Sequence, residues 1–476
     1  MRQMEAAVSG RLSVKNVSGS TQLAVVTILL ALCTLGCRTQ QNRLEQFDRH
    51  YTKGDWDGAQ TFVEQKTPVE DSVLWTLQRA SVERMRQDYQ ASNESFDRAE
   101  TMMQRHETDA KGLDVIGSTL VSEGVLPYRG EVYDGIMINT YKALNFMALG
   151  RDDLARIEFN RATERQRRAK EYFDREIKQV KKEMSQDKNS GKVDYQKTLD
   201  DPNTESKIRS KYSSLYDFEA YPDFMNPFAT YLGGVFFSMT GDPAKAIDLL
   251  KESVGMVKEN RTIEKDFADV DRWLGGGGAI EPSVWVILEN GLGPVKQEFR
   301  VDLPLFLFTD DVLYAGIALP RLSPRSQAVD SLEVAAGDTW VTTETVANMD
   351  RVIQTEFAKD FPAILTRALI SATAKALVQH AILKQNTSGN DFLGLVAAVY
   401  NVATTVADLR IWTSLPKDFQ VARVPMPENG DVRLRWNKTK EVAVSIQPCQ
   451  YALVYVKKVA AGQEPVVQVV ARGRPR

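Results

Sequence analysis

The sequence predicts an α+β protein in which an array of α-helical hairpins is followed by a C-terminal domain of antiparallel strands with a helical pair. Three observations lead to this prediction: a recurring spacing of small and large residues in the first half, four consecutive glycines at 275–278, and a change to period-two alternation after them. The 476 residues are 43% apolar and 26% charged, proportions of a globular chain with two or three domains. The net charge of −3 shows no basic excess of the kind that nucleic-acid binding requires.

The N-terminus has the composition of an export signal. Residues 23–35 are thirteen positions without a charge, fewer than the roughly twenty that a spanning helix needs. They lead into Gly36-Cys37, an ending that resembles a bacterial lipobox, in which the cysteine is acylated. We therefore expect residues 1–36 to be a lipoprotein signal peptide and Cys37 to anchor the chain through acyl chains; a plain cleaved signal or a short anchor is the alternative. Thr39 favours the outer membrane, by analogy with enteric lipoprotein sorting.

One spacing recurs along the first half: a turn residue, then a small, a large apolar and a small residue five, four and three positions further on. Gly150 and Gly241 start full matches, Gln87 a looser one, and Gly54 only the beginning of one. Upstream of the full matches, small and aromatic residues occupy the positions where two antiparallel helices of a tetratricopeptide (TPR) hairpin touch. The turn residues are 33, 63 and 91 positions apart, and only the first interval matches a repeat of about 34. We therefore expect an irregular TPR-like helical domain over 37–274; ordinary amphipathic helices with coincidental spacing are the alternative.

Two segments inserted between the hairpins have distinct compositions. Apolar residues at helical intervals predict a long helix after Arg161, and residues 161–182 hold nine basic and four acidic side chains. Such a face could meet anionic lipid or a partner, although a solvated face is the simpler interpretation. Residues 185–213 hold few apolar side chains and predict a mobile loop.

The four glycines predict a linker over 275–282, because glycine favours no regular element and no Lys-Ser/Thr follows at phosphate-loop spacing. From 283 to 476 we expect a mixed α/β domain with strands at both ends and helices about 344–410, in two stretches, 344–385 and 391–410. The uncharged run 392–407 would be a helix of about 24 Å, short of a hydrocarbon core of about 30 Å, so a buried helical pair is favoured over membrane insertion. Strands are expected near 283–289, 296–301, 312–319, 331–341, 419–424, 431–435, 441–447, 450–457 and 465–471.

Four motifs, in order, resemble the signatures of a family of bacterial secreted lipoproteins with a TPR-like helical N-terminal half and a mixed α/β C-terminal domain. They cover about 125–425 and are Pro127-Tyr128-Arg129-Gly130-Glu131 with Tyr141-Lys142-Ala143-Leu144-Asn145, Asn226-Pro227-Phe228 with Tyr231-Leu232-Gly233-Gly234, Glu289 to Lys296, and Ala407-Asp408-Leu409-Arg410-Ile411-Trp412 with Leu415-Pro416 and Val421 to Val424. The resemblance implies secretion, lipidation and this architecture, and it carries over no established activity. Nine motif residues are candidates for a partner-binding groove or interface; alternatively, they satisfy buried polar groups where elements meet. These are Tyr128, Arg129, Glu131, Tyr141, Asn145, Asn226, Asp408, Arg410 and Trp412.

The sequence holds few residues of the types that catalysis or metal binding requires. The three histidines, His50, His106 and His380, stand far apart, and none has a His or Cys at metal-ligand spacing. The sequence has no Gly-x-Ser-x-Gly elbow and no His-Glu-x-x-His motif, so it predicts no enzyme, no cofactor and no metal site. Glycan hydrolysis by a pair of carboxylates is the alternative. Cys449, in an alternating apolar stretch, is expected to be a buried core thiol.

These features predict an outer-membrane-anchored lipoprotein that faces the periplasm and acts as an interaction scaffold. Its hairpins are expected to present a concave surface to another envelope protein. The expected partners are membrane lipid through the Cys37 acyl chains and unknown envelope proteins, with no nucleic acid. A peptidoglycan-binding or glycan-active protein, or a subunit of an export or surface-assembly complex, are the alternatives.

Overall fold

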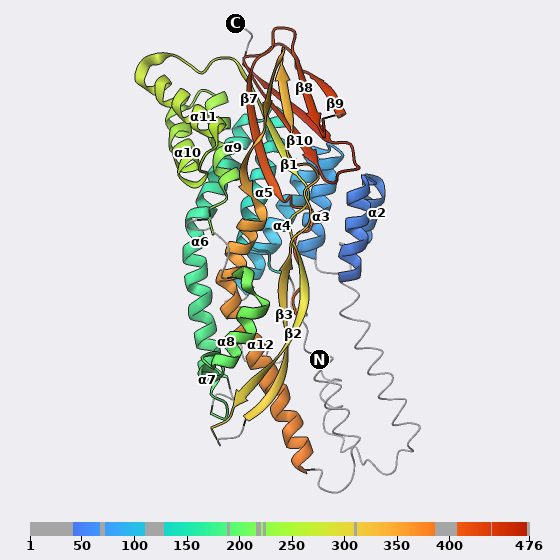
Figure 1. The fold of residues 1–476 in the computed structure, drawn as a ribbon, viewed down its shortest axis with the longest axis vertical. Helices are drawn as coiled ribbons and strands as arrows, with labels where there is room; N and C mark the ends of the chain where they lie inside the picture. The colour runs from blue at the N-terminus through green and yellow to red at the C-terminus, as the bar shows by residue number, and fades with distance from the viewer. Residues whose placement is uncertain are drawn as a thin grey trace, which may run out of the picture.

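The structure is a computed structural model that describes residues 41–66, 72–109, 128–187, 191–215, 220–221, 225–308, 312–385, 407–438 and 440–473. The predicted signal peptide, Cys37, His380 as a side chain and nearly all of the run 392–407 lie outside this description. Figure 1 shows an elongated molecule, with helices packed beside a stack of strands and an arm that extends away from the C-terminal end. Within the described ranges, no helix combines the length and the apolar character needed to cross a membrane.

Consecutive helices of the first half pack against one another in chain order. The four predicted turn residues all have positive φ, from 62° at Gln87 to 81° at Gly241, a left-handed conformation that reverses the chain between two helices. At one helix contact, a Cβ added to Gly234 would lie 2.8 Å from Leu250, so the small residue permits the close approach. Helix pairs therefore occur at the predicted turns. The helices are 41–53, α2 (Trp56–Lys66), α3 (Ser72–Met85), α4 (Tyr89–Asp109), α5 (Val132–Ala148), α6 (Asp152–Gln186), α9 (Pro227–Met239), α10 (Pro243–Met256) and α11 (Arg261–Arg272).

Strands of the second half form two packed sheets. The larger has the order β11-β10-β1-β7-β6, and the smaller has the order β5-β4-β8-β9. All neighbouring strands in these two sheets are antiparallel except β1 and β10, which are parallel, so the predicted antiparallel arrangement is confirmed apart from this pair. The buried Cys449 lies in the core between the sheets. The strands are β1 (Ser283–Asn290), β4 (Glu333–Ala336), β5 (Thr339–Thr342), β6 (Glu344–Asn348), β7 (Asp418–Pro425), β8 (Asp431–Trp436), β9 (Lys440–Ser445), β10 (Tyr451–Lys458) and β11 (Val466–Arg472).

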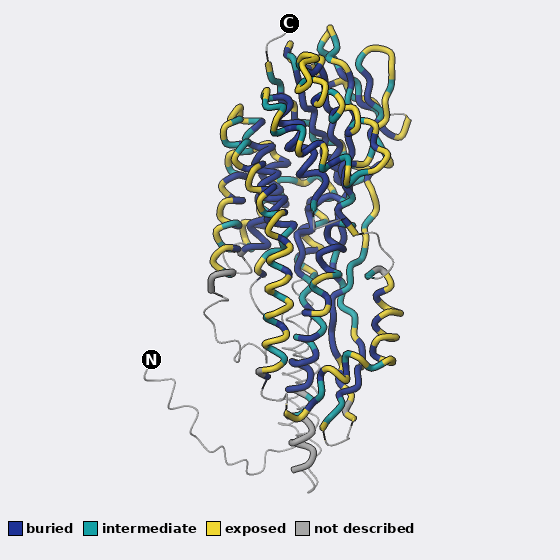
Figure 2. The backbone as a smooth tube through the Cα atoms, turned by 90° about the vertical axis from the view of Figure 1, so that its left-hand side faces the viewer, coloured by how far each residue is buried: buried dark blue, intermediate teal, exposed yellow. Residues whose placement is uncertain are grey.

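The five-stranded sheet is covered on both faces. All eight residues of β1 are buried, and alternate side chains point to opposite sides. Trp285 and Ile287 belong to the core shared with the helices, whereas Val284 and Val286 belong to the core shared with the second sheet. Figure 2 shows the resulting buried segments through the middle of the molecule. The helical half and the strand half therefore share one hydrophobic core.

The arm brings together segments that are far apart in the sequence. The two-stranded ribbon of β2 (Val295–Phe306) and β3 (Val312–Ser323) packs with α12 (Met349–Gln385), the end of α6, α7 (Tyr195–Leu199) and α8 (Pro202–Lys211). Tyr195, Ile208 and Tyr212 are buried in its core. The prediction of a mobile loop over 185–213 is therefore wrong for the described residues, because the few apolar side chains of this segment are the ones that the arm buries.

One further sequence prediction needs correction in the second half. Residues 344–348, predicted as helix, form β6, which pairs with β7 through a bulge. In the predicted linker, Gly276 and Gly278 have positive φ, and the non-helical backbone of Gly276 interrupts the turn that follows α11. The second predicted helix, 391–410, falls outside the described residues except at 407–410, which are irregular.

Candidate functional site

Several of the nine candidate residues lie in the interface between the helices and the five-stranded sheet. The Tyr141 hydroxyl donates to Glu289 Oε1 on β1 over 2.8 Å. Trp412 Nε1 donates to Ser81 Oγ on α3 over 2.9 Å, and the indole stands edge-on to the Tyr141 ring, with ring centres 5.9 Å apart. Tyr141 and Trp412 are both buried, so they join the two halves of the chain and do not line an open groove.

Asn145 connects three elements of this interface. Its side chain accepts from Arg84 Nη1 over 2.7 Å and donates to Ser92 Oγ over 3.0 Å, which links α5 to α3 and α4. The Arg84 guanidinium lies between the rings of Tyr141 and Tyr455, 4.9 and 4.8 Å from their centres. The two ring faces and the amide oxygen replace the water that the Arg84 guanidinium loses on burial. Asn145 therefore positions the Arg84 guanidinium, which contacts both the helices and the sheet.

Glu289 is the buried anion at the centre of the interface. Lys457 Nζ lies 2.5 Å from Oε1, and the Tyr455 hydroxyl donates to Oε2 over 2.5 Å. Burial disfavours the charge of Lys457, but the neighbouring Glu289 outweighs it, so the pKa of Lys457 is raised. Burial, together with the adjacent Glu289, raises the pKa of Tyr455 well above its usual value. Lys457 therefore stays charged and the Tyr455 phenol stays neutral.

Asn226 is a helix cap. Its side-chain oxygen accepts from the backbone N–H groups of Phe228 and Ala229 over 3.1 and 3.4 Å at the first turn of α9. Its own backbone N–H donates to Gln166 Oε1 over 2.6 Å. The side chain is fully buried, so it satisfies donors that would otherwise be unpaired.

The first motif reaches the root of the arm, where β2 and α12 leave the body. The Tyr128 hydroxyl donates to Asp134 Oδ2 over 2.5 Å, and the Glu131 backbone N–H donates to the same atom over 2.9 Å. Lys296, at the start of β2, lies with Nζ 3.0 Å from Glu131 Oε1. The first and third motifs, separated by 165 positions, therefore meet here.

The fourth motif closes the same region. Arg410 holds Asp408 with two hydrogen bonds of 2.7 and 2.8 Å, and its guanidinium lies 5.7 Å from the centre of the Tyr128 ring. Arg410 is buried, whereas Arg129 of the first motif is exposed. The structure thus brings Tyr128, Glu131, Asp408 and Arg410 together and leaves Arg129 outside the group.

Two acidic residues on α12, Glu356 and Asp360, join Glu131 and Asp134 in what we term the carboxyl cluster. Glu131, Glu356 and Asp360 line a cavity of about 20 Å³ together with Lys296. Burial raises the pKa of Asp134 to about 7, although the hydrogen bonds that its carboxylate accepts lower the pKa. Burial, with a smaller contribution from Glu131, raises the pKa of Glu356 well above its usual value, and within the described part of the chain neither of its buried side-chain oxygens accepts a hydrogen bond that meets standard geometry. This cluster was missed because acids at i and i+4 on an apolar helix face are also typical of an exposed edge.

The carboxyl cluster makes the stability of the protein depend on pH. A carboxyl whose pKa is raised in the folded state binds more protons there than in the unfolded chain, so the free energy of unfolding falls as pH rises from about 4 towards 7 or above. We expect Glu356→Gln, which resembles the protonated form, to raise the free energy of unfolding by about 1–3 kcal/mol at pH 8 and by much less near pH 5. Urea unfolding followed by circular dichroism measures both values. The exposed Glu428→Gln is the control and should change neither; an equal gain at both pH values would contradict the prediction.

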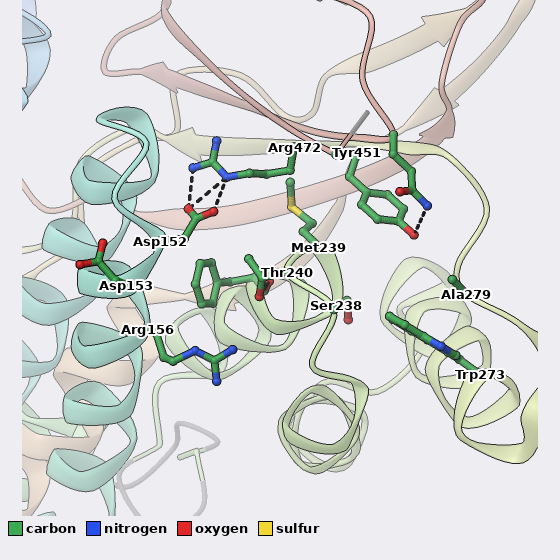
Figure 3. Close-up of a pocket in the computed structure, with 14 residues that line it drawn as sticks. Asp152, Asp153, Arg156, Ser238, Met239, Thr240, Trp273, Ala279, Tyr451 and Arg472 are labelled. Carbon is green, nitrogen blue, oxygen red and sulfur yellow. Dashed lines mark hydrogen bonds and ion pairs between the residues drawn. The ribbon is translucent and has the colours of Figure 1, made fainter. Parts of the chain in front are cut away.

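An open cleft of about 610 Å³ lies between the turn ends of two hairpins and the edge of the five-stranded sheet (Figure 3). This volume is in the usual range for ligand sites, about 300–1,000 Å³. The start of α6, the α9–α10 turn, the residue after α11 and the ends of the two last strands each contribute to the wall. The side chains include Asp152, Asp153, Arg156, Met239, Trp273, Tyr451 and Arg472.

The charges in the cleft wall are paired. Arg472 Nη2 lies 2.6 Å from Asp152 Oδ1, and Arg156 Nη1 lies 2.7 Å from Asp242 Oδ2. The half-buried Trp273 adds an aromatic face on the opposite wall. A wall with paired charges and an aromatic surface suits an amphipathic segment of a larger molecule better than a small ion. The cleft could not be predicted from the sequence, because its walls come from five segments that only the fold brings together.

Comparisons with protein-family models, with curated proteins and with solved structures give no match for this chain. Among the described residues, no group of three or more His, Cys, Asp or Glu side chains is arranged to hold a metal ion. The chemistry of the candidate site therefore rests on the contacts described above.

Proposed function

We propose that this protein is an outer-membrane-anchored periplasmic lipoprotein whose TPR-like helical array acts as a scaffold and binds a segment of another envelope protein in the open cleft. The sequence features at Cys37 support the anchor, and the helix pairs at the predicted turns support the array. The observation that carries the proposal is the cleft itself, where two hairpin turns and the sheet edge form one surface of ligand size.

The position of the cleft differs from the binding surface expected from the sequence. The side of the helices that holds Tyr141 and Asn145 is covered by the chain's own sheet. The turn ends around Gly150 and Gly241 stay open, and Gly241 lines the cleft. We therefore assign partner binding to the turn ends of the hairpins, where a bound segment would place an apolar side chain on Trp273 and polar groups beside Asp152 and Arg472.

Site-specific photo-crosslinking in cells tests this assignment. A photoreactive amino acid at the exposed Asp153 should give a discrete crosslinked protein, and one at the exposed Thr339, on the second sheet, should not. Adding Trp273→Ala should weaken the Asp153 crosslink about tenfold or more, because burial of an aromatic side chain contributes about 1.5–3 kcal/mol. The same bands from both positions, or a crosslink insensitive to Trp273→Ala, would contradict the proposal.

Glycan binding is the second candidate function, and the cleft also supports it. An aromatic face next to a carboxylate–guanidinium pair can stack on a sugar ring and hydrogen-bond its hydroxyls. Co-sedimentation with purified peptidoglycan sacculi separates the two candidates. Retention that is lost in Trp273→Ala, without a protein crosslink from Asp153, would favour glycan over protein.

A further inference from the structure

The distal end of the arm exposes large apolar side chains. Tyr314 and Phe308 are 70% and 61% exposed, the two highest values among the exposed large hydrophobic residues of the described chain, and Val312 is 44% exposed. The register of the ribbon pairs Phe306 with Val312 and Pro304 with Tyr314, which places these four side chains on one face. The opposite face, with Leu303, Leu305 and Ile317, is buried in the arm core. On this face Pro304 is buried and Phe306 half-buried, so the apolar side chains that the described chain leaves exposed at the tip are Phe308, Val312 and Tyr314.

Two lysines, Lys192 and Lys197, lie against this tip. The Phe308 backbone N–H donates to the Lys192 carbonyl, and Lys197 Nζ lies 4.8 Å from the centre of the Phe306 ring. The preceding helix, α6, ends at Gln186, only six residues before Lys192. Three more exposed lysines, Lys178, Lys181 and Lys182, lie on the last turns of α6, and none of the five lysines forms an ion pair with another described residue.

The acids at the same end are largely occupied by structural contacts. Asp194 and Asp201 cap α7 and α8, Asp187 accepts from the Tyr195 hydroxyl, and Glu183 pairs with Arg367. Arg367 balances the charge of Glu183, whereas the other three carboxylates keep their negative charge and hold it at the starts of α7 and α8 and beside Tyr195. Asp310 and Asp311 lie in sequence between the two strands, outside the described residues, and their charge would oppose deep insertion into hydrocarbon.

We propose that the distal end of the arm is a contact surface for an anionic phospholipid bilayer. Aromatic and aliphatic side chains bind at the boundary between headgroups and acyl chains, while lysines attract anionic headgroups. A bilayer offers both environments in adjacent layers, whereas an acidic protein surface would serve the lysines and leave Phe308 and Tyr314 uncovered. The predicted acyl anchor at Cys37 would keep the bilayer within reach, and the arm contact would orient the body on it. This surface is separate from the cleft and does not depend on what the cleft binds.

Vesicle binding by the chain from residue 37 onward, with Cys37→Ser to remove the anchor, tests the proposal. We expect co-sedimentation with phosphatidylcholine vesicles that contain a quarter of phosphatidylglycerol, weaker binding at high salt, and little binding to phosphatidylcholine alone. A tip variant (Phe308→Ser, Val312→Ser, Tyr314→Ser) and a lysine variant (Lys178→Glu, Lys181→Glu, Lys182→Glu) should each bind at least tenfold more weakly. An environment-sensitive fluorophore on Tyr314→Cys should brighten on these vesicles, and one on Thr339→Cys should not.

Matched variants control for apolar surface and charge. Leu149→Ser, Leu274→Ser and Val341→Ser remove exposed apolar side chains elsewhere, and Lys251→Glu, Lys258→Glu and Lys265→Glu reverse three exposed charges on the α10–α11 side. Both sets should bind vesicles as the parent chain does. Equal losses in the test and control variants, or no binding of the parent chain to anionic vesicles, would overturn the proposal. So would a photoreactive residue at position 314 that captures a protein and no lipid in cells.

Discussion

Replacement of Glu289 by glutamine is expected to lower the free energy of unfolding by about 3–5 kcal/mol, because it leaves the buried Lys457 ammonium without a counter-charge. Glu289 is fully buried and accepts hydrogen bonds from Tyr141 and Tyr455 besides pairing with Lys457. A neutral amide supplies one acceptor oxygen where the carboxylate supplied two, so one of the phenols also loses its partner. Urea unfolding followed by circular dichroism measures the loss.

Two controls separate the buried pair from a general effect of charge. Glu464→Gln removes the partner of Lys440 in an exposed pair of 3.0 Å and should change the free energy of unfolding by less than about 1 kcal/mol. The double variant Glu289→Leu with Lys457→Met replaces both charges by apolar groups and should recover much of the stability lost in the single variant. A single variant as stable as the parent chain would show that the interface tolerates an unpaired lysine, and our account of the junction would then be wrong.

Trp412→Ala should cost about 3–5 kcal/mol of unfolding free energy, the usual cost of truncating a large buried aromatic side chain. Trp412 is 1% exposed, packs against Phe96 and Tyr141, and donates its N–H to two serine hydroxyls. Truncation would leave a cavity between the helices and the irregular segment that follows residue 407. Thermal and urea unfolding both report this loss.

This variant also distinguishes the two interpretations of the motif that contains Trp412. A ligand-binding tryptophan would lose binding on truncation with little change in stability, whereas a residue that joins the two halves would lose stability. Trp412→Phe should retain most of the packing and lower the free energy of unfolding by less, about 1–3 kcal/mol. This loss arises because the two buried serine hydroxyls no longer receive the indole N–H. The half-buried Trp340, which stacks on Arg433 and Arg435 at the surface, provides the control, and Trp340→Ala should cost much less than Trp412→Ala.

Elements with a local signal were predicted well from the sequence. The left-handed turns at Gly150 and Gly241 follow from glycine at the end of an apolar helical pattern, and the buried strand β1 follows from its run of apolar residues. Gln87 was found only through the spacing of its neighbours, because glutamine by itself indicates no turn. Each of these features depends on residues within about one turn of helix or one strand.

Elements decided by distant partners were not predicted. Residues 344–348 have no strand signal strong enough to outweigh the helical pattern that follows, and they form β6 because β7 offers a free edge. Tyr195, Ile208 and Tyr212 stand too far apart to predict a packed segment, and the arm core is what makes them buried. Local propensity is a weak preference that tertiary contacts override.

The candidate residues divide in the same way. Their identities were recognisable as motifs, but whether Tyr141 faces a groove or an interface depended on Glu289, 148 positions further along the chain. Composition and short-range spacing were thus enough to predict an α+β chain with helix pairs and strands, because backbone conformation and amphipathic patterning act over a few residues. The shared core, the carboxyl cluster, the cleft and the exposed arm tip required the fold, since burial and charge pairing depend on which distant segments become neighbours.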